Sequence, residues 1–197
     1  MPLSPTQIIA LVSRASEALQ TIQDQLGIRN VPAARIRFPQ GFIKTAETHR
    51  KSLPNLGSEV QRRNASYALM SLDVFRWLLI RTTLASAASS MIVKEGICVI
   101  GALCEWLTKE ATRGYASGRP YRQRTAKLVE LNHIEPELET ELDWIWDIRC
   151  NEHLHEVTSL EHVMYSRDDY DRPQKAYFAL RDALIREHGC IATPTPQ

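Results

Sequence analysis

The sequence has little glycine, only 8 of its 197 residues, and no glycine-rich loop that could hold a phosphate. It has no long apolar run: the charge-free stretch from Thr82 to Val93 is too short, and too rich in Ser, Thr and Ala, to cross a bilayer. The amino terminus lacks the basic start and apolar core of a secretion signal. At 44% hydrophobic and 24% charged residues, the composition excludes a disordered or collagen-like chain. We therefore expect a cytoplasmic protein with no membrane partner.

Cysteine is also scarce, and no two cysteines are separated by the two residues typical of zinc ligands. The four are Cys98, Cys104, Cys150 and Cys190. We interpret them as buried, reduced thiols rather than as a disulfide framework or a zinc site. Since no nucleophile elbow or zinc-protease motif occurs either, the sequence predicts no metal and no cofactor.

Charge is balanced overall, at a formal +1, but it is distributed unevenly. Residues 1–98 are net basic and residues 99–197 net acidic. Within the second half, residues 113–127 hold five cations and no acid, and residues 130–147 hold seven acids with no Lys or Arg. Such blocks can steer an anionic ligand to one face, although they are more commonly the solvated faces of helices.

The spacing of apolar residues is that of helices throughout. Apolar side chains recur at steps of three and four after the Ser4-Pro5 pair, which predicts a helix that is capped by Ser4 and stops at Gly27. Residues 28–57 interrupt the pattern with prolines and glycines. We interpret them as a long basic connection with a short helical turn around residues 43–51.

The remaining apolar patterns predict an all-α protein, an up-and-down bundle of about five or six helices. The expected helices cover residues 58–84, 88–112, 121–132, from Pro136 to about 150, and 173–187. We expect the first of these to bury Val60 and Tyr67, and the last to bury Phe178. The predicted organisation is an N-terminal helix and basic arm at 1–57, a bundle at 58–190 and a frayed tail at 191–197.

The densest group of reactive side chains follows the apolar part of the Pro136 helix. It consists of Arg149, Asn151, His153 and His155. Arg149 and His153 are four residues apart and share a helical face, whereas Arg149 and His155 converge only if the helix bends or ends between them. Arginine binds phosphate oxygens and histidine moves protons near neutral pH. Together they suffice for metal-free attack on RNA, which supplies its own nucleophile, the 2′-hydroxyl.

Two other interpretations of this group remain open. Arg149 could pair with a nearby carboxylate while the histidines cap helix carbonyls, which is a common role for charged helix ends. A metal site on His153, His155 and Glu156 is a weaker hypothesis, because alternate residues on a helix diverge and no further ligand has suitable spacing.

At these residues the chain resembles the HEPN superfamily (higher eukaryotes and prokaryotes nucleotide-binding domains). The hallmark of that superfamily is an Arg, usually followed by a polar residue, and then a His after roughly four to six intervening residues, late in a small helical bundle. Arg149 and His155 are separated by five residues, which fits this spacing. Cys150 departs from the pattern, because the polar Asn151 comes one place late. This fits either a shifted register or a bundle that has lost activity.

The resemblance implies a metal-independent endoribonuclease, a hydrolase of RNA that leaves a 2′,3′-cyclic phosphate. It implies that Arg149 stabilises charge on the phosphate, that His155 is the acid or base, and that Asn151 and His153 assist. It also implies a homodimer, acting in a toxin–antitoxin, phage-defence or stress system with an antitoxin or nucleotidyltransferase as possible partner. Many HEPN domains are noncatalytic modules that bind RNA or protein, and that alternative stays open.

A loop upstream of the motif mixes basic and aromatic residues, a combination that can neutralise phosphates and stack on bases. The predicted RNA-binding residues are Arg113, Arg119, Tyr121, Arg122, Arg124 and Lys127. The alternative is an exposed connection whose tyrosines pack locally.

Overall fold

The structure, a computed structural model, describes residues 2–150 and 164–190. These residues form seven α-helices and two short 3-10 helices, and none of them lies in a β-strand. The predicted all-α class is therefore confirmed. The chain divides into two compact units between Gln40 and Gly41, so the unit that contains the bundle begins before residue 58.

The first unit contains α1 (Pro5–Leu26) and a 3-10 turn, η1 (Pro32–Ala34). Ser4 and Gln7 form a capping box, in which each side chain accepts a hydrogen bond from the other residue's backbone N–H. Gly27 ends the helix with a φ of +55°, a conformation that glycine adopts at little cost. The predicted start and stop of this helix are confirmed. No residue of α1 is buried.

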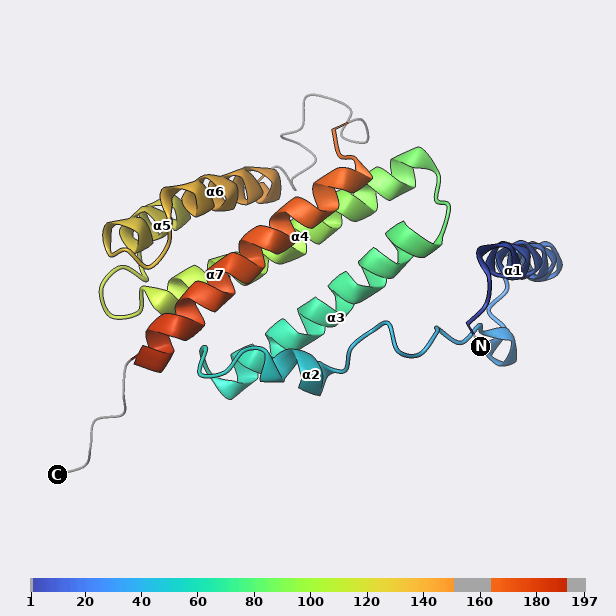
Figure 1. Ribbon diagram of the computed structural model, residues 1–197, viewed down its shortest axis with the longest axis horizontal. Coiled ribbons are helices and arrows are strands. Elements are labelled where there is room, and N and C mark those ends of the chain that lie inside the picture. Colours follow the sequence, from blue (N-terminus) through green and yellow to red (C-terminus); the bar gives the residue numbers. More distant parts are fainter. Residues whose placement is uncertain (1, 151–163, 191–197) are drawn as a thin grey trace. The chain divides into compact units, whose positions relative to one another are not determined.

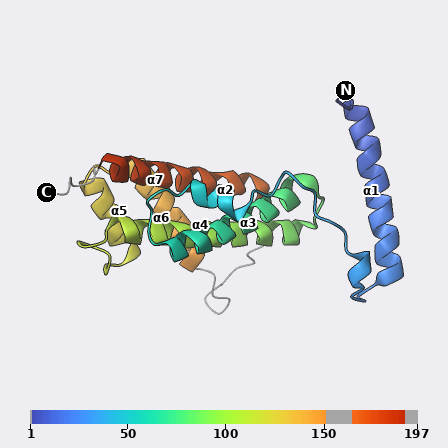
Figure 2. The same cartoon turned by 90° about the horizontal axis from the view of Figure 1, so that it is seen from below.

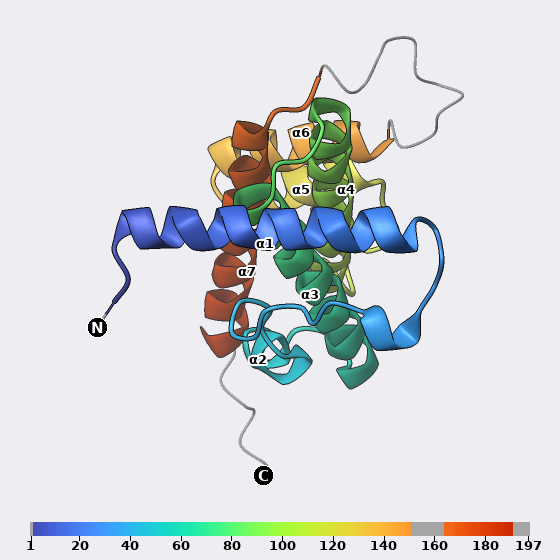
Figure 3. The same ribbon diagram turned by 90° about the vertical axis from the view of Figure 1, so that its right-hand side faces the viewer.

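The second unit holds the other six helices. They are α2 (Ala46–Lys51), α3 (Glu59–Arg81), α4 (Ser86–Ala111), α5 (Tyr121–Glu130), α6 (Pro136–Cys150) and α7 (Asp171–Cys190). Figure 1 shows the chain direction alternating through α3, α4, α6 and α7, which is the up-and-down arrangement that the sequence predicted. The short α2 lies against α3, as Figures 1 and 3 show, and α5 lies against α6.

Helix α4 is the centre of this unit, because it contacts α3, α5, α6 and α7 (Figure 2). Its residues Ile97, Ile100, Cys104 and Leu107 are completely buried. By length and composition alone α4 could cross a membrane. Most of its apolar stretch is instead buried inside the bundle, which is the pattern of a core helix.

Three predictions of buried side chains are wrong. On α3, Val60 is 67% exposed and Tyr67 is 56% exposed. The buried stripe runs instead through the opposite face, with residues such as Leu69 and Leu72, because α3 carries apolar residues on both faces. On α7, Phe178 is 42% exposed and its ring leans against the buried ring of Tyr177, with the centroids 5.4 Å apart.

The cysteines follow the prediction in part. Cys98 and Cys104 are buried and form no disulfide. Burial raises the pKa of the Cys104 thiol, which makes it a poor nucleophile. Cys150 is exposed at the end of α6, so the prediction that it is buried is wrong.

Candidate functional site

Arg149 lies in the last turn of α6 and is fixed there by two contacts. One of its guanidinium nitrogens, Nη2, lies 2.8 Å from Oε2 of Glu105 on α4. The centre of the guanidinium lies 4.9 Å from the ring centroid of Trp146, one turn earlier on α6, which is a cation–π distance. The Arg149 side chain is 28% exposed, so solvent reaches a cation that the protein has already positioned.

Gly101 allows this close approach of α6 to α4. A Cβ atom at this position would lie 3.0 Å from Cδ of Arg149 and 3.3 Å from Cγ2 of Ile145. Both distances are tighter than ordinary van der Waals contact. The position of Arg149 therefore depends on a residue that has no side chain of its own.

Trp146 connects Arg149 to α5. The ring of Tyr121, at the start of α5, stacks on Trp146 with a centroid distance of 4.4 Å and an interplanar angle of 5°. Tyr121 is buried, and this burial raises the pKa of its hydroxyl, which stays protonated. Such an aromatic pair fixes the spacing of the two helices beside the arginine.

A second charged group lies on the same pair of helices. Arg122 of α5 forms ion pairs with Asp147 and, at 3.5 Å, with Asp143, both on α6. Partial burial raises the pKa of Asp143 above its ordinary value, although the Arg122 charge acts in the opposite direction. The basic and acidic blocks of the sequence thus meet across α5 and α6 at these residues.

The other predicted catalytic residues, Asn151, His153 and His155, lie outside the described residues, as does Glu156 of the alternative metal site. Their predicted roles remain predictions. Within the part of the chain that the structure describes, no three His, Cys, Asp or Glu side chains gather in a way that could hold a metal ion.

The predicted RNA-binding residues have different environments. Tyr121 and Arg122 lie beside Trp146 and Asp147 of α6, close to Arg149 in the chain. Arg113 and Lys127 pair with the neighbouring carboxylates of Glu110 and Glu130.

Arg124 is buried and donates from Nη1 to the backbone carbonyl of Arg119, at 2.6 Å. Its Nε and Nη2 have no hydrogen-bond partner among the described residues. The side chain of Arg119 itself is exposed.

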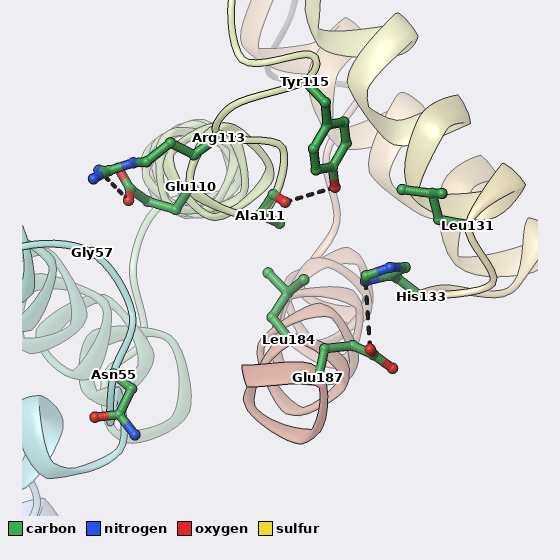
Figure 4. A pocket seen from close by; sticks show the side chains of 10 residues that line it. All are labelled: Asn55, Gly57, Glu110, Ala111, Arg113, Tyr115, Leu131, His133, Leu184 and Glu187. Atoms are coloured by element: carbon green, nitrogen blue, oxygen red, sulfur yellow. Dashed lines mark hydrogen bonds and ion pairs between the residues drawn. The ribbon is translucent and has the colours of Figure 1, made fainter. Parts of the chain in front are cut away.

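Arg113 also lines an open pocket of about 440 Å³ at the end of α4 (Figure 4). His133 faces Glu187 across this pocket at 3.9 Å, and the Tyr115 hydroxyl donates to the carbonyl of Ala111 at 2.7 Å. His133 was not among the residues that the sequence pattern indicated. It lies in the turn two residues before Glu135-Pro136, where α6 begins, and a histidine at such a position does not by itself indicate a binding site.

The roles of Glu105 and Gly101 as positioning residues for Arg149 could not be predicted from the sequence. Both precede it by more than forty residues, and no local pattern links them to it. Comparisons with protein-family models, with curated proteins and with solved structures found no match.

Proposed function

We propose that this protein is a HEPN-like, metal-independent endoribonuclease whose site is built on Arg149. The observation that supports the proposal is the fixed, partly exposed guanidinium at the end of α6, held by Glu105 and Trp146. An arginine that is positioned in advance can stabilise a phosphate transition state without reorganising during the reaction. The motif histidines follow it within six residues.

In the proposed reaction, the RNA supplies the nucleophile. His155 takes the proton of a 2′-hydroxyl, and the resulting oxygen attacks the adjacent phosphorus. A bond forms from O2′ to phosphorus, and the bond from phosphorus to the 5′-oxygen breaks. The leaving oxygen takes up a proton, which gives a 2′,3′-cyclic phosphate and a 5′-hydroxyl. Arg149 binds the developing negative charge, and Asn151 and His153 assist.

The wider proposal is a cytoplasmic homodimer that binds RNA through the loop and α5 residues named above. It would act in a toxin–antitoxin, phage-defence or stress system, with an antitoxin or a nucleotidyltransferase as partner. Arg119 and Arg122 are the exposed cations of this set that lie nearest in sequence to the Tyr121–Trp146 stack. They are the positions at which we expect phosphate contacts.

The test is incubation of the purified protein with total RNA in excess EDTA, beside the His155→Ala and His153→Ala variants. We expect the wild-type protein to cleave in EDTA, and we expect the His155→Ala variant not to. Loss of cleavage in His153→Ala alone would assign the acid–base role to the histidine four residues after Arg149. Equal cleavage by all three proteins would contradict the proposed site.

A noncatalytic HEPN-like module that binds RNA or a protein is the second candidate. The observation that favours it is the pairing of cations with the protein's own carboxylates, at Arg149, Arg122, Arg113 and Lys127. For this candidate, substitutions lower affinity or stability and there is no turnover to lose. Filter binding of RNA to the wild-type protein, without any cleavage in the assay above, would favour the module.

A further inference from the structure

A cavity of about 150 Å³ lies where α2, α3, α4 and α7 meet. In Figure 2, α2 lies between α3 and α7. An engineered cavity of about the same size in another protein holds benzene, so a small organic ligand fits here. The cavity contains none of the residues assigned to the RNA site, and the inference drawn from it does not depend on the proposed function.

Two polar groups that line the cavity are buried without a hydrogen-bond partner among the described residues. They are the hydroxyl of Tyr177 and the amide Nε2 of Gln174, both on α7. Tyr177 is 1% exposed, and burial raises the pKa of its hydroxyl, which therefore remains a donor at neutral pH. Buried polar groups in proteins nearly always have a partner. Both of these donors therefore require an acceptor.

The charged residues of the lining favour an anion as that acceptor. Lys44, Arg76 and Arg181 line the cavity with one carboxylate, that of Asp73, which leaves a formal excess of two positive charges. The Asp73 carboxylate is already engaged. Its Oδ2 accepts hydrogen bonds from the ring of His49 and from the backbone N–H of Lys44, each at 2.9 Å.

The three cations differ in how far they are engaged within the protein. Arg181 contacts the neighbouring carboxylate of Asp182, and its guanidinium lies 4.8 Å from the ring centroid of Phe178. Arg76 and Lys44 are exposed. The cavity thus combines exposed cations with buried neutral donors, an arrangement that suits a ligand whose charged end enters from solvent.

We propose that this cavity binds a phosphate monoester of a small organic molecule. A phosphate monoester carries about −1.5 to −2 charges at pH 7, and Lys44 and Arg76, the two exposed cations of the lining, can pair with its charged end. Its oxygens accept hydrogen bonds from Tyr177 and Gln174 and pair with Arg76. Leu69, Leu72 and Ile100 contact the organic part.

The test is isothermal titration of the full-length protein with phenyl phosphate at pH 7.5. We expect saturable binding that is weakened about 10-fold or more by Tyr177→Phe and by Arg76→Gln, because each removes one donor to a charged acceptor. Arg186→Gln is the matched control, since Arg186 is an exposed residue of α7 outside the cavity. Benzyl alcohol, which lacks the phosphate, should not bind.

Two further arms complete the experiment. A 5′-phosphorylated trinucleotide is titrated beside phenyl phosphate. Tighter binding of the trinucleotide would identify a nucleic-acid end as the source of the phosphate, and tighter binding of phenyl phosphate would identify a small metabolite. Circular dichroism checks the fold of each variant. If Tyr177→Phe does not fold, Arg76→Gln still tests the proposal, because Arg76 is exposed and its substitution should not disturb the fold. Absence of binding at millimolar phenyl phosphate, or full affinity in Arg76→Gln, would overturn the proposal.

Discussion

Helix α6 takes part in two arginine–glutamate–tryptophan contacts that differ in geometry. Arg172 of α7 binds Glu141 through two nitrogens, with Nε 2.6 Å and Nη2 3.0 Å from the carboxylate oxygens, and lies 3.9 Å from the ring centroid of Trp144. Arg149 binds Glu105 through one nitrogen and lies farther from its ring, that of Trp146. The residue types are the same, but the number of bonds is not.

The difference separates a structural contact from a candidate functional one. The two-nitrogen pair of Arg172 is the arrangement in which a carboxylate matches the planar fork of arginine most fully. Among the described residues, Arg149 contacts a carboxylate only through Nη2, beside the Trp146 ring, and Glu105 does not engage its other donors. An arginine that is fixed but not fully matched can bind a phosphate oxygen in addition to its own carboxylate.

Substitution of the two arginines tests this comparison with the largest expected effect. We expect Arg149→Ala to lower RNA cleavage in EDTA by about 10²–10³-fold, the loss typical when one positioned transition-state donor is removed. Arg172→Ala, which removes the matched contact, should cleave at the wild-type rate. Initial rates on one labelled RNA measure both. Equal losses in the two variants would remove the distinction between the two contacts.

Gly101→Ala sharpens the comparison by moving Arg149 without removing it. The new methyl group would meet Cδ of Arg149 at 3.0 Å, so the side chain must shift. We expect about a 10-fold loss of cleavage, because small displacements of a positioned group are costly. The free energy of unfolding should fall by at most about 2 kcal/mol, since overpacking costs about 1–3 kcal/mol and the gain in helix propensity offsets about 1 kcal/mol. Cleavage rates and urea denaturation, measured on the same preparation, check both parts.

The structural role of Arg172 is tested by stability. Arg172→Ala should lower the free energy of unfolding by about 1 kcal/mol, from an ion pair of about 0.2–1 kcal/mol and a cation–π contact of about 0.5–1 kcal/mol. Urea denaturation of this variant and of the wild-type protein measures the difference. No change in the unfolding midpoint would mean that the Arg172 contact does not stabilise the fold. Arg172 could then not serve as the structural contact with which Arg149 is compared.

The smallest expected effect concerns Asp143, whose pKa is raised mainly by burial. For a carboxyl with a raised pKa, the contribution to stability is fully present below its ordinary pKa and is lost as pH rises through the folded-state pKa. The stability of Asp143→Asn relative to the wild-type protein should therefore increase as pH rises through that window. Carbon-13 NMR titration of the carboxyl gives the midpoint directly. A midpoint below the ordinary aspartate value would contradict the raised pKa.

Local chemistry allowed much of the fold to be predicted. Ser4 and Ser58 each cap the helix that they were expected to begin, and Pro136 opens α6. The buried face of α3 could not be predicted in the same way. Apolar residues lie on both of its faces. The face that contains Tyr67 and the face that contains Leu69 each have apolar residues at helical spacing, so either could have been the buried one. Only packing against the neighbouring helices distinguishes them.

The candidate site was predictable to a smaller extent. The sequence singled out Arg149 from its spacing to the histidines, which is a local signal. The contact of Arg149 with Glu105 and the close approach at Gly101 arise from the packing of α4 against α6. Contacts between two helices do not show in the residue spacing of either helix. The meeting of Arg122 with Asp147 is of the same kind: the charge blocks were visible, and their pairing was not.

The terminal groups of the cleaved RNA show whether the RNA supplies the nucleophile and whether Arg149 takes part. RNA cut by the wild-type protein in EDTA is analysed for its terminal groups, with the Arg149→Ala reaction beside it. We expect 2′,3′-cyclic phosphate and 5′-hydroxyl ends that disappear in the variant. Ends with 5′-phosphate and 3′-hydroxyl, or cyclic phosphate ends that persist in Arg149→Ala, would contradict an RNA-supplied nucleophile acting at this arginine.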